Sequence, residues 1–182
     1  MINEAHKKTI KSFVKREGRM TAGQASALTR LKHLILPETE KVTTWADIFG
    51  NSNPVVMEIG FGTGQGLAEM ALKNPDKNFV GIEVYRTGVA RLLAQIERLN
   101  LSNVRIYCCD CIVVLSKLVP QSSLDKVQVF FPDPWPKKRH SKNRIIQNDF
   151  LTLLAQISTR TSKLYFRTDD KPYFDWTTSM IK

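Results

Sequence analysis

Short apolar runs alternate with longer amphipathic stretches from Val55 almost to the end of the chain. This alternation predicts a mostly parallel sheet covered on both faces by crossover helices, the doubly wound α/β architecture. Ligands of such folds bind beyond the carboxyl ends of the strands. The predicted strands are Val55–Ile59, Phe79–Glu83, Val104–Cys108, Val127–Phe131 and Leu164–Arg167. The first predicted helix ends near Lys73 and the last begins near Lys171. Between them, helices are predicted over Thr87–Leu99, Cys111–Leu118 and Asn143–Ser158.

The chain length predicts a single domain. Its 182 residues can enclose one hydrophobic core but not two of ordinary size. Residues 1–35 contain no strand-like run and include a basic stretch from Lys7 to Arg19, so we interpret them as a basic N-terminal arm. Residues 36–182 are predicted to form the domain, with its globular core beginning near Val55, after helix-breaking residues at 50–54.

The charge balance favours a polyanionic partner. Lys and Arg number 27 against 17 Asp and Glu, a formal net charge of +10. Cations that neutralise phosphates release condensed counterions, which favours binding to nucleic acid. Charge alone leaves the matter open, because many unrelated small proteins are equally basic.

Several classes of protein are disfavoured. No signal peptide or apolar run of membrane-spanning length is visible, so we expect no membrane partner and a cytoplasmic location. Cys108, Cys109 and Cys111 are too crowded for a disulfide framework and are interpreted as reduced thiols. No spacing typical of a zinc site appears, so no metal is expected.

A glycine-rich loop follows the first predicted strand. It reads Glu58-Ile-Gly60-Phe-Gly62-Thr-Gly64-Gln-Gly66 and leads into a helix. Missing side chains let a ligand approach the backbone, and a helix N-terminus offers free amide groups, so a nucleotide-like cofactor is predicted. The dinucleotide spacing Gly-x-Gly-x-x-Gly fails in every register. The loop instead resembles motif I of the Rossmann-like class I methyltransferases; the alternative is a glycine turn without a ligand.

Acidic residues follow the next two strands. Glu83 ends the second strand, where a carboxylate accepts hydrogen bonds from ribose hydroxyls of NAD or S-adenosylmethionine alike. Asp110 follows the third strand; the methyltransferase resemblance implies that it faces an adenine amino group. Taken singly, Asp110 fits a helix N-cap better than a ligand.

The fourth strand leads into the most specific motif. Phe130-Phe131-Pro132-Asp133-Pro134-Trp135, followed by a lysine-rich stretch, resembles the signature of the bacterial tRNA (guanine-N7-)-methyltransferases. The segment from Gly18 to Gln24 resembles the N-terminal part of that family. Phe166-Arg167-Thr168-Asp169, with Pro172 and Tyr173, resembles its late Thr-Asp motif. The resemblance thus extends from about residue 10 to residue 173.

The resemblance implies methyl transfer from S-adenosylmethionine to N7 of a guanine in the tRNA variable loop (position 46). It implies that Asp133 is the active-site residue. Lys137 and Asp169 would contact RNA, unless they are a solvated charge and a turn residue. Arg139 and Arg144 belong to a cluster of five cations, Lys137 to Arg144, that we expect to hold phosphates. The cofactor-binding residues expected are Glu58, Gly60, Gly62, Gly64, Glu83, Asp110 and Asp133.

The sequence departs from the family at its C-terminal end. The two strands that usually close the sheet and the later Thr-x-x-Glu segment are absent, so we expect a fragment whose last strand leaves an unpaired edge. Cofactor binding should then survive better than RNA methylation. Alternatives are a catalytically impaired fragment, an RNA-binding module that retains the cofactor fold, a methyltransferase for another substrate and, less well matched, a nicotinamide dehydrogenase. The oligomeric state expected is a monomer or a homodimer.

Overall fold

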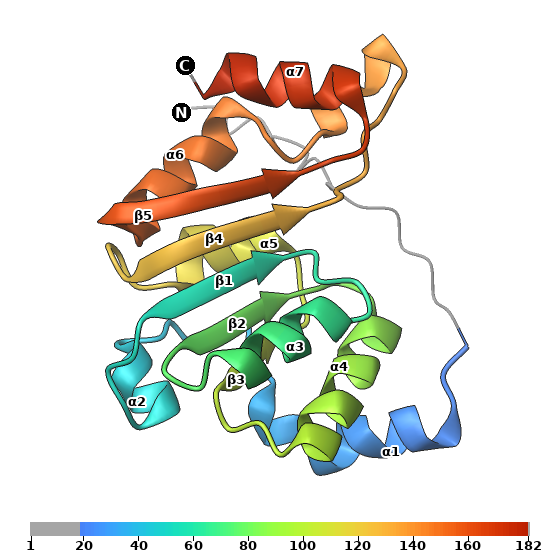
Figure 1. Ribbon diagram of the computed structural model, residues 1–182, viewed down its shortest axis with the longest axis vertical. Helices are drawn as coiled ribbons and strands as arrows, with labels where there is room; N and C mark the ends of the chain where they lie inside the picture. The colour runs from blue at the N-terminus through green and yellow to red at the C-terminus, as the bar shows by residue number, and fades with distance from the viewer. Residues whose placement is uncertain (1–18, 182) are drawn as a thin grey trace, which may run out of the picture.

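The computed structural model describes residues 19–181 and contains one five-stranded sheet with the strand order β3-β2-β1-β4-β5. All four neighbouring pairs are parallel, which confirms the doubly wound α/β prediction (Figure 1). The strands are β1 Val55–Ile59, β2 Asn78–Ile82, β3 Val104–Tyr107, β4 Leu124–Phe130 and β5 Ser158–Arg167.

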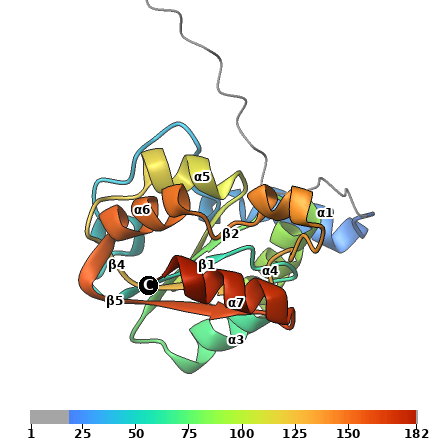
Figure 2. The same cartoon turned by 90° about the horizontal axis from the view of Figure 1, so that it is seen from above.

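Helices lie on both sides of the sheet. Figure 2 shows α5 and α6 on one side and α3 on the other. The helices that follow the strands are α3 Gln65–Lys73, α4 Arg86–Leu99, α5 Cys111–Val113 with a π-helical continuation Val114–Leu118, α6 Asn148–Ile157 and, after β5, α7 Lys171–Met180. The remaining helices are α1 Ala22–Arg30, η1 Lys32–Leu34, α2 Trp45–Phe49 and η3 Lys138–Asn143.

The alternation of side chains along β1 divides the core in two. Met57 and Ile59 pack in the cluster formed with α5 and α6, whereas Val56 packs in the cluster formed with α3 and α4. Both faces are covered, so all five residues of β1 are buried. The central strand therefore holds its carboxyl end, where the glycine loop begins, in a fixed position.

The globular part begins earlier than the sequence predicts. Helix α1 packs against α4, with Ala27 fully buried, and Ile35 forms an isolated parallel bridge with Ile106 of β3. Arg30 forms an ion pair with Glu97 of α4 at 2.8 Å. The segment from Ala22 onward is therefore part of the folded body, not of an arm before it. Nearly all of the predicted basic stretch lies outside the described residues, except exposed Arg19.

The predicted helix Asn143–Ser158 is shorter in the structure, and the strand after it is longer. Helix α6 begins only at Asn148, because the preceding segment is extended and its Ile146 is tied to α7 by Tyr173 and Trp176. Strand β5 begins at Ser158, not at Leu164. Its first half is polar, so no apolar run indicated it. Among the described residues, β5 forms one edge of the sheet.

Candidate active site

A pocket lies at the carboxyl ends of β1 and β4. From this point, successive strands are added toward one edge of the sheet from β1 to β3 and toward the other edge from β4 to β5, so the order of strands reverses here. This switch point is where open α/β sheets bind ligands. Its walls come from four segments: the end of β1, the β2–α4 turn, the β3–α5 turn and the loop after β4. Lining residues include Ile59, Gly60, Glu83, Tyr85, Cys109, Cys111, Phe131, Asp133, Trp135, Asn143 and Ile145.

Three glycines with left-handed backbone conformations determine the path of the glycine loop. Gly60, Gly62 and Gly64 have φ of 74°, 59° and 74°, a region that glycine occupies without strain. A Cβ at Gly88 of α4 would lie 2.1 Å from the Gly62 carbonyl oxygen, so α4 packs directly against the loop. Of the three predicted loop glycines, Gly60 lines the pocket and the other two lie outside its lining.

Glu83 is held by backbone amides. Its Oε2 accepts a hydrogen bond from the Gly62 N–H at 2.8 Å, and Oε1 accepts from Val84 at 2.7 Å and Tyr85 at 3.1 Å. The residue is 6% exposed and lines the pocket. A carboxylate offers about four acceptor positions, so roughly one remains for a ligand. The sequence had suggested that Glu83 accepts hydrogen bonds from both ribose hydroxyls of a cofactor.

Glu58 contrasts with Glu83 because one of its oxygens is buried without a partner. Its side chain is 5% exposed and Oε2 has no hydrogen bond. Burial raises the pKa of the Glu58 carboxyl to about 7. Glu58 does not line the pocket, but Ile59 and Gly60, the next two residues, do. An unpaired buried carboxylate beside the glycine loop is suited to a cationic ligand group.

Asp110 caps a helix in the structure. It is the N-cap of α5, and its side chain accepts a hydrogen bond from the Ile112 N–H at 2.8 Å. This is the alternative that the sequence left open. Asp110 itself is outside the pocket lining, although Cys109 and Cys111 on either side of it belong to the lining.

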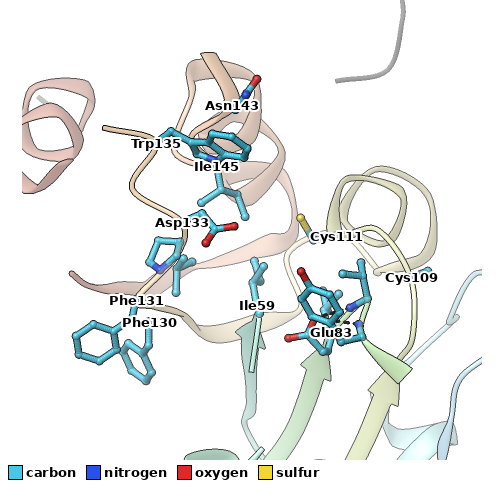
Figure 3. A pocket seen from close by; sticks show the side chains of 16 residues that line it. Ile59, Glu83, Cys109, Cys111, Phe130, Phe131, Asp133, Trp135, Asn143 and Ile145 are labelled. Carbon is cyan, nitrogen blue, oxygen red and sulfur yellow. Dashed lines mark hydrogen bonds between the residues drawn. The ribbon is translucent and has the colours of Figure 1, made fainter. Parts of the chain in front are cut away.

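The loop after β4 presents Asp133 to the pocket. Asp133 is exposed and lies between Pro132 and Pro134, and Figure 3 shows its carboxylate between Ile145 and Ile59. The Phe131 N–H donates to the Arg167 carbonyl oxygen at 2.8 Å, which ties the start of the loop to the end of β5. The loop therefore holds a carboxylate at the mouth of the pocket.

The predicted RNA-contacting residues occupy different environments. Lys137 and Arg139 are exposed, and Asp169 is exposed on the loop after β5, at the same edge of the sheet as the pocket. Arg144 is only 8% exposed; its Nε donates to the Pro134 carbonyl oxygen at 2.9 Å. Its guanidinium also lies 5.0 Å from the Tyr173 ring centroid. Arg144 thus braces the Asp133 loop from inside and is poorly placed to hold a phosphate.

Sequence reasoning missed several residues of the lining. Cys109 and Cys111 were interpreted only as reduced thiols, and Asn143 and Ile145 were assigned to a helix. Both cysteines follow the third predicted strand at the carboxyl edge of the sheet, and this position could have indicated that they line the pocket.

Among residues 19–181, no group of three or more His, Cys, Asp or Glu side chains could hold a metal ion. No described helix is long and apolar enough to cross a membrane.

Comparison with known proteins decides the family. The family described as "Putative methyltransferase" matches residues 52–182. A tRNA (guanine-N7-)-methyltransferase of Aliivibrio salmonicida is 44% identical over 165 residues, which cover 90% of this chain and 69% of the relative. One of Alcanivorax borkumensis is 45% identical over the same shares.

This chain belongs to the tRNA (guanine-N7-)-methyltransferase family. It spans 62% of the length of another member, from Vibrio vulnificus, which is 46% identical over 148 residues, 81% of this chain. Solved structures share its fold. An antibiotic-related methyltransferase superposes with a TM-score of 0.59 at 18% identity, covering 81% of this chain and 78% of its own. The aminoglycoside resistance methyltransferase NpmB1 superposes at 0.54 and 17% identity, covering 71% and 63%.

S-adenosylmethionine is the methyl donor of this family, and the residues around the pocket fit it. The donor carries an ammonium group, two ribose hydroxyls and an adenine. The buried, unpaired Glu58 oxygen suits the ammonium group, and Glu83 retains acceptor capacity for a hydroxyl. The left-handed Gly60 leaves the pocket floor free of a side chain.

Proposed function

We propose that this chain transfers the methyl group of S-adenosylmethionine to N7 of a guanine in tRNA. The observation that supports this most is Asp133, which stands at the mouth of the pocket opposite the glycine loop, in a chain of this family. We further propose the variable-loop guanine at position 46 as the target and the cytoplasm as the location. A monomer or homodimer remains our proposal for the oligomeric state.

S-adenosylmethionine, when bound, supplies a methyl group on a positively charged sulfur. Guanine N7 already exposes a lone pair, so the protein has no proton to remove; alignment and exclusion of water are its tasks. The N7–carbon bond forms as the carbon–sulfur bond breaks, and positive charge passes to the purine. The Asp133 carboxylate would stabilise that charge and orient the ring.

The cofactor contacts are proposals that follow the geometry above. Glu58 would pair with the ammonium group of S-adenosylmethionine, and Glu83 with one of its ribose hydroxyls. Gly60, which has no side chain, would let the methionine part of the cofactor approach the backbone. Asp110 would reach the adenine amino group with the carboxylate oxygen that does not cap α5. Gly62 and Gly64 would act through the shape of the loop.

The RNA contacts divide into surface and internal residues. Lys137 and Arg139, both exposed beside the Asp133 loop, would hold phosphates, and Asp169 would approach the RNA from the loop after β5. Arg144 would contribute by bracing Pro134 and not by touching RNA.

The test uses the atom that is methylated. Two tRNA transcripts would be compared, one with guanosine and one with 7-deazaguanosine at the variable-loop position, with isotopically labelled S-adenosylmethionine as donor. We expect label only in the guanosine transcript, at the ring position N7. Equal labelling of both transcripts would show that another atom is methylated. No label in either, with the cofactor bound, would contradict the proposed activity.

A further inference from the structure

The outward face of β4 and β5 carries an unusual set of side chains. The register pairs Lys126 with Lys163, Gln128 with Tyr165 and Phe130 with Arg167, so these six residues share one face of the sheet. The opposite face of the same strands packs with α5 and α6 in the core. Figure 1 shows β4 and β5 in open view, whereas α3 and α4 lie over the β1–β2 half. We call these six residues, with Phe131, the β4–β5 face.

Two cations lie against aromatic rings on this face. The Lys126 Nζ lies 4.7 Å from the Tyr165 ring centroid, and the Arg167 Cζ lies 5.2 Å from the Phe130 ring centroid. Lys163, Tyr165 and Arg167 are exposed. The three register pairs contain three cations and no acid. Exposed rings beside unpaired positive charge are the combination with which proteins bind single-stranded nucleic acid.

Phe131 extends this face to the active site. Its side chain is 63% exposed, the largest exposed fraction among the large apolar residues described, and it lines the pocket. Its φ of 49° is a left-handed conformation that is unfavourable for a bulky residue. The hydrogen bond from its N–H to the Arg167 carbonyl oxygen, 2.8 Å long, fixes this conformation.

Backbone strain of this kind is concentrated at ligand sites. Here the strained conformation leaves the aromatic ring of Phe131 exposed to solvent. Figure 3 shows Phe130 and Phe131 on one side of Asp133, with Trp135 and Asn143 on the other. The cations Lys137 and Arg139, both exposed, follow Trp135 along the chain. The proposed function uses these cations, but it does not use the aromatic side chains Phe130 and Phe131.

We propose that the β4–β5 face is a second RNA-contact surface, on which a base next to the target guanine stacks on Phe131 while the backbone phosphates follow Arg167 and Lys163. The inference rests on the proposed function, because it places the target guanine beside Asp133. The net charge of +10 and the absence of acids from the register pairs make a polyanion the fitting occupant.

The test measures tRNA affinity against salt concentration by fluorescence anisotropy. The variants are Phe131→Ala and the double variant Lys163→Gln/Arg167→Gln. The matched control is Lys73→Gln/Lys117→Gln, which removes two exposed cations from α3 and from the π-helical turn after α5. Binding of S-adenosylhomocysteine, measured by calorimetry, reports whether each variant retains its cofactor pocket.

Phe131→Ala should weaken tRNA binding about tenfold, with the salt dependence unchanged, because stacking is lost. Lys163→Gln/Arg167→Gln should lower the slope of log affinity against log salt by roughly one to two, more than the control does. Binding assays do not require catalysis, so these results stand even if no methyl is transferred. Unchanged tRNA affinity in both variants would overturn the inference. So would a change confined to self-association of the free protein, which would make the face a contact between copies.

Discussion

At the scale of single residues, two buried glutamates at the ends of neighbouring strands have opposite environments. Glu83 receives three backbone N–H groups, whereas Glu58 Oε2 receives no hydrogen bond and the pKa of Glu58 is raised to about 7. Both acids were predicted from the sequence as pocket residues. Their different hydrogen bonding could not be, because it depends on which backbone amides the folded loop brings within reach.

The raised pKa of Glu58 makes stability depend on pH. Its folded value of about 7 exceeds its ordinary value of 4.5, so the folded state binds the proton more tightly. The resulting stabilisation is complete below pH 4.5 and is lost as pH rises through 7. Relative to Glu58→Gln, which stays neutral, the wild type should lose about 2 kcal/mol between pH 5 and pH 8. Urea unfolding of both proteins at the two pH values measures this; equal changes in both would refute it.

Arg144 shows where residue-level reasoning from the sequence failed. It stands in a run of five cations, and nothing local distinguishes it from exposed Lys137 or Arg139. Its burial depends on the rings of Tyr173 and Trp176, which α7 brings back from about 30 residues further along the chain. Such long-range packing leaves no mark in the spacing of the run.

At the scale of elements, the glycine-rich turn from β1 into α3 could be predicted because the left-handed conformations of its backbone are a local requirement for glycine. Gly64 is the N-cap of α3, with φ of 74°, and a Cβ there would lie 2.6 Å from Leu92 Cβ. Helix α6 and strand β5 were harder to delimit, since the ends of both are set by partners elsewhere. Ile146 is held by α7, and the polar start of β5 pairs with Leu124.

Two alanine substitutions in the loop should differ sharply. Gly64→Ala combines a left-handed conformation with a steric clash and should lower the free energy of unfolding by about 2–4 kcal/mol. Gly66→Ala, two residues later inside α3, meets no atom within 4 Å and should leave stability equal or slightly higher. Thermal unfolding of the two variants checks this. Similar melting temperatures would show that the loop yields without strain.

At the scale of the whole molecule, the alternation of elements predicted the parallel sheet, and the order of strands then determines the site. Because β1 and β4 are neighbours, the glycine loop and the Asp133 loop face each other, although about 70 residues of sequence separate them. The sequence did not reveal that residues 22–36 pack against α4 and β3, because their apolar residues form no strand-like run and do not indicate which surface they will contact. Ala27 and Leu34 are buried only because α4 and β3 offer a complementary surface.

The central claim is that Asp133, at the junction of β1 and β4, serves methyl transfer. The most direct measurement is the single-turnover rate of methyl transfer to unmodified tRNA by the wild type, Asp133→Asn and the control Asp76→Asn, an exposed acid in the turn between α3 and β2. Removing a charge that stabilises the transition state should slow transfer about a hundredfold or more, with tRNA and cofactor affinities little changed. Asp76→Asn should match the wild type. An Asp133→Asn rate equal to that of the wild type would contradict the account.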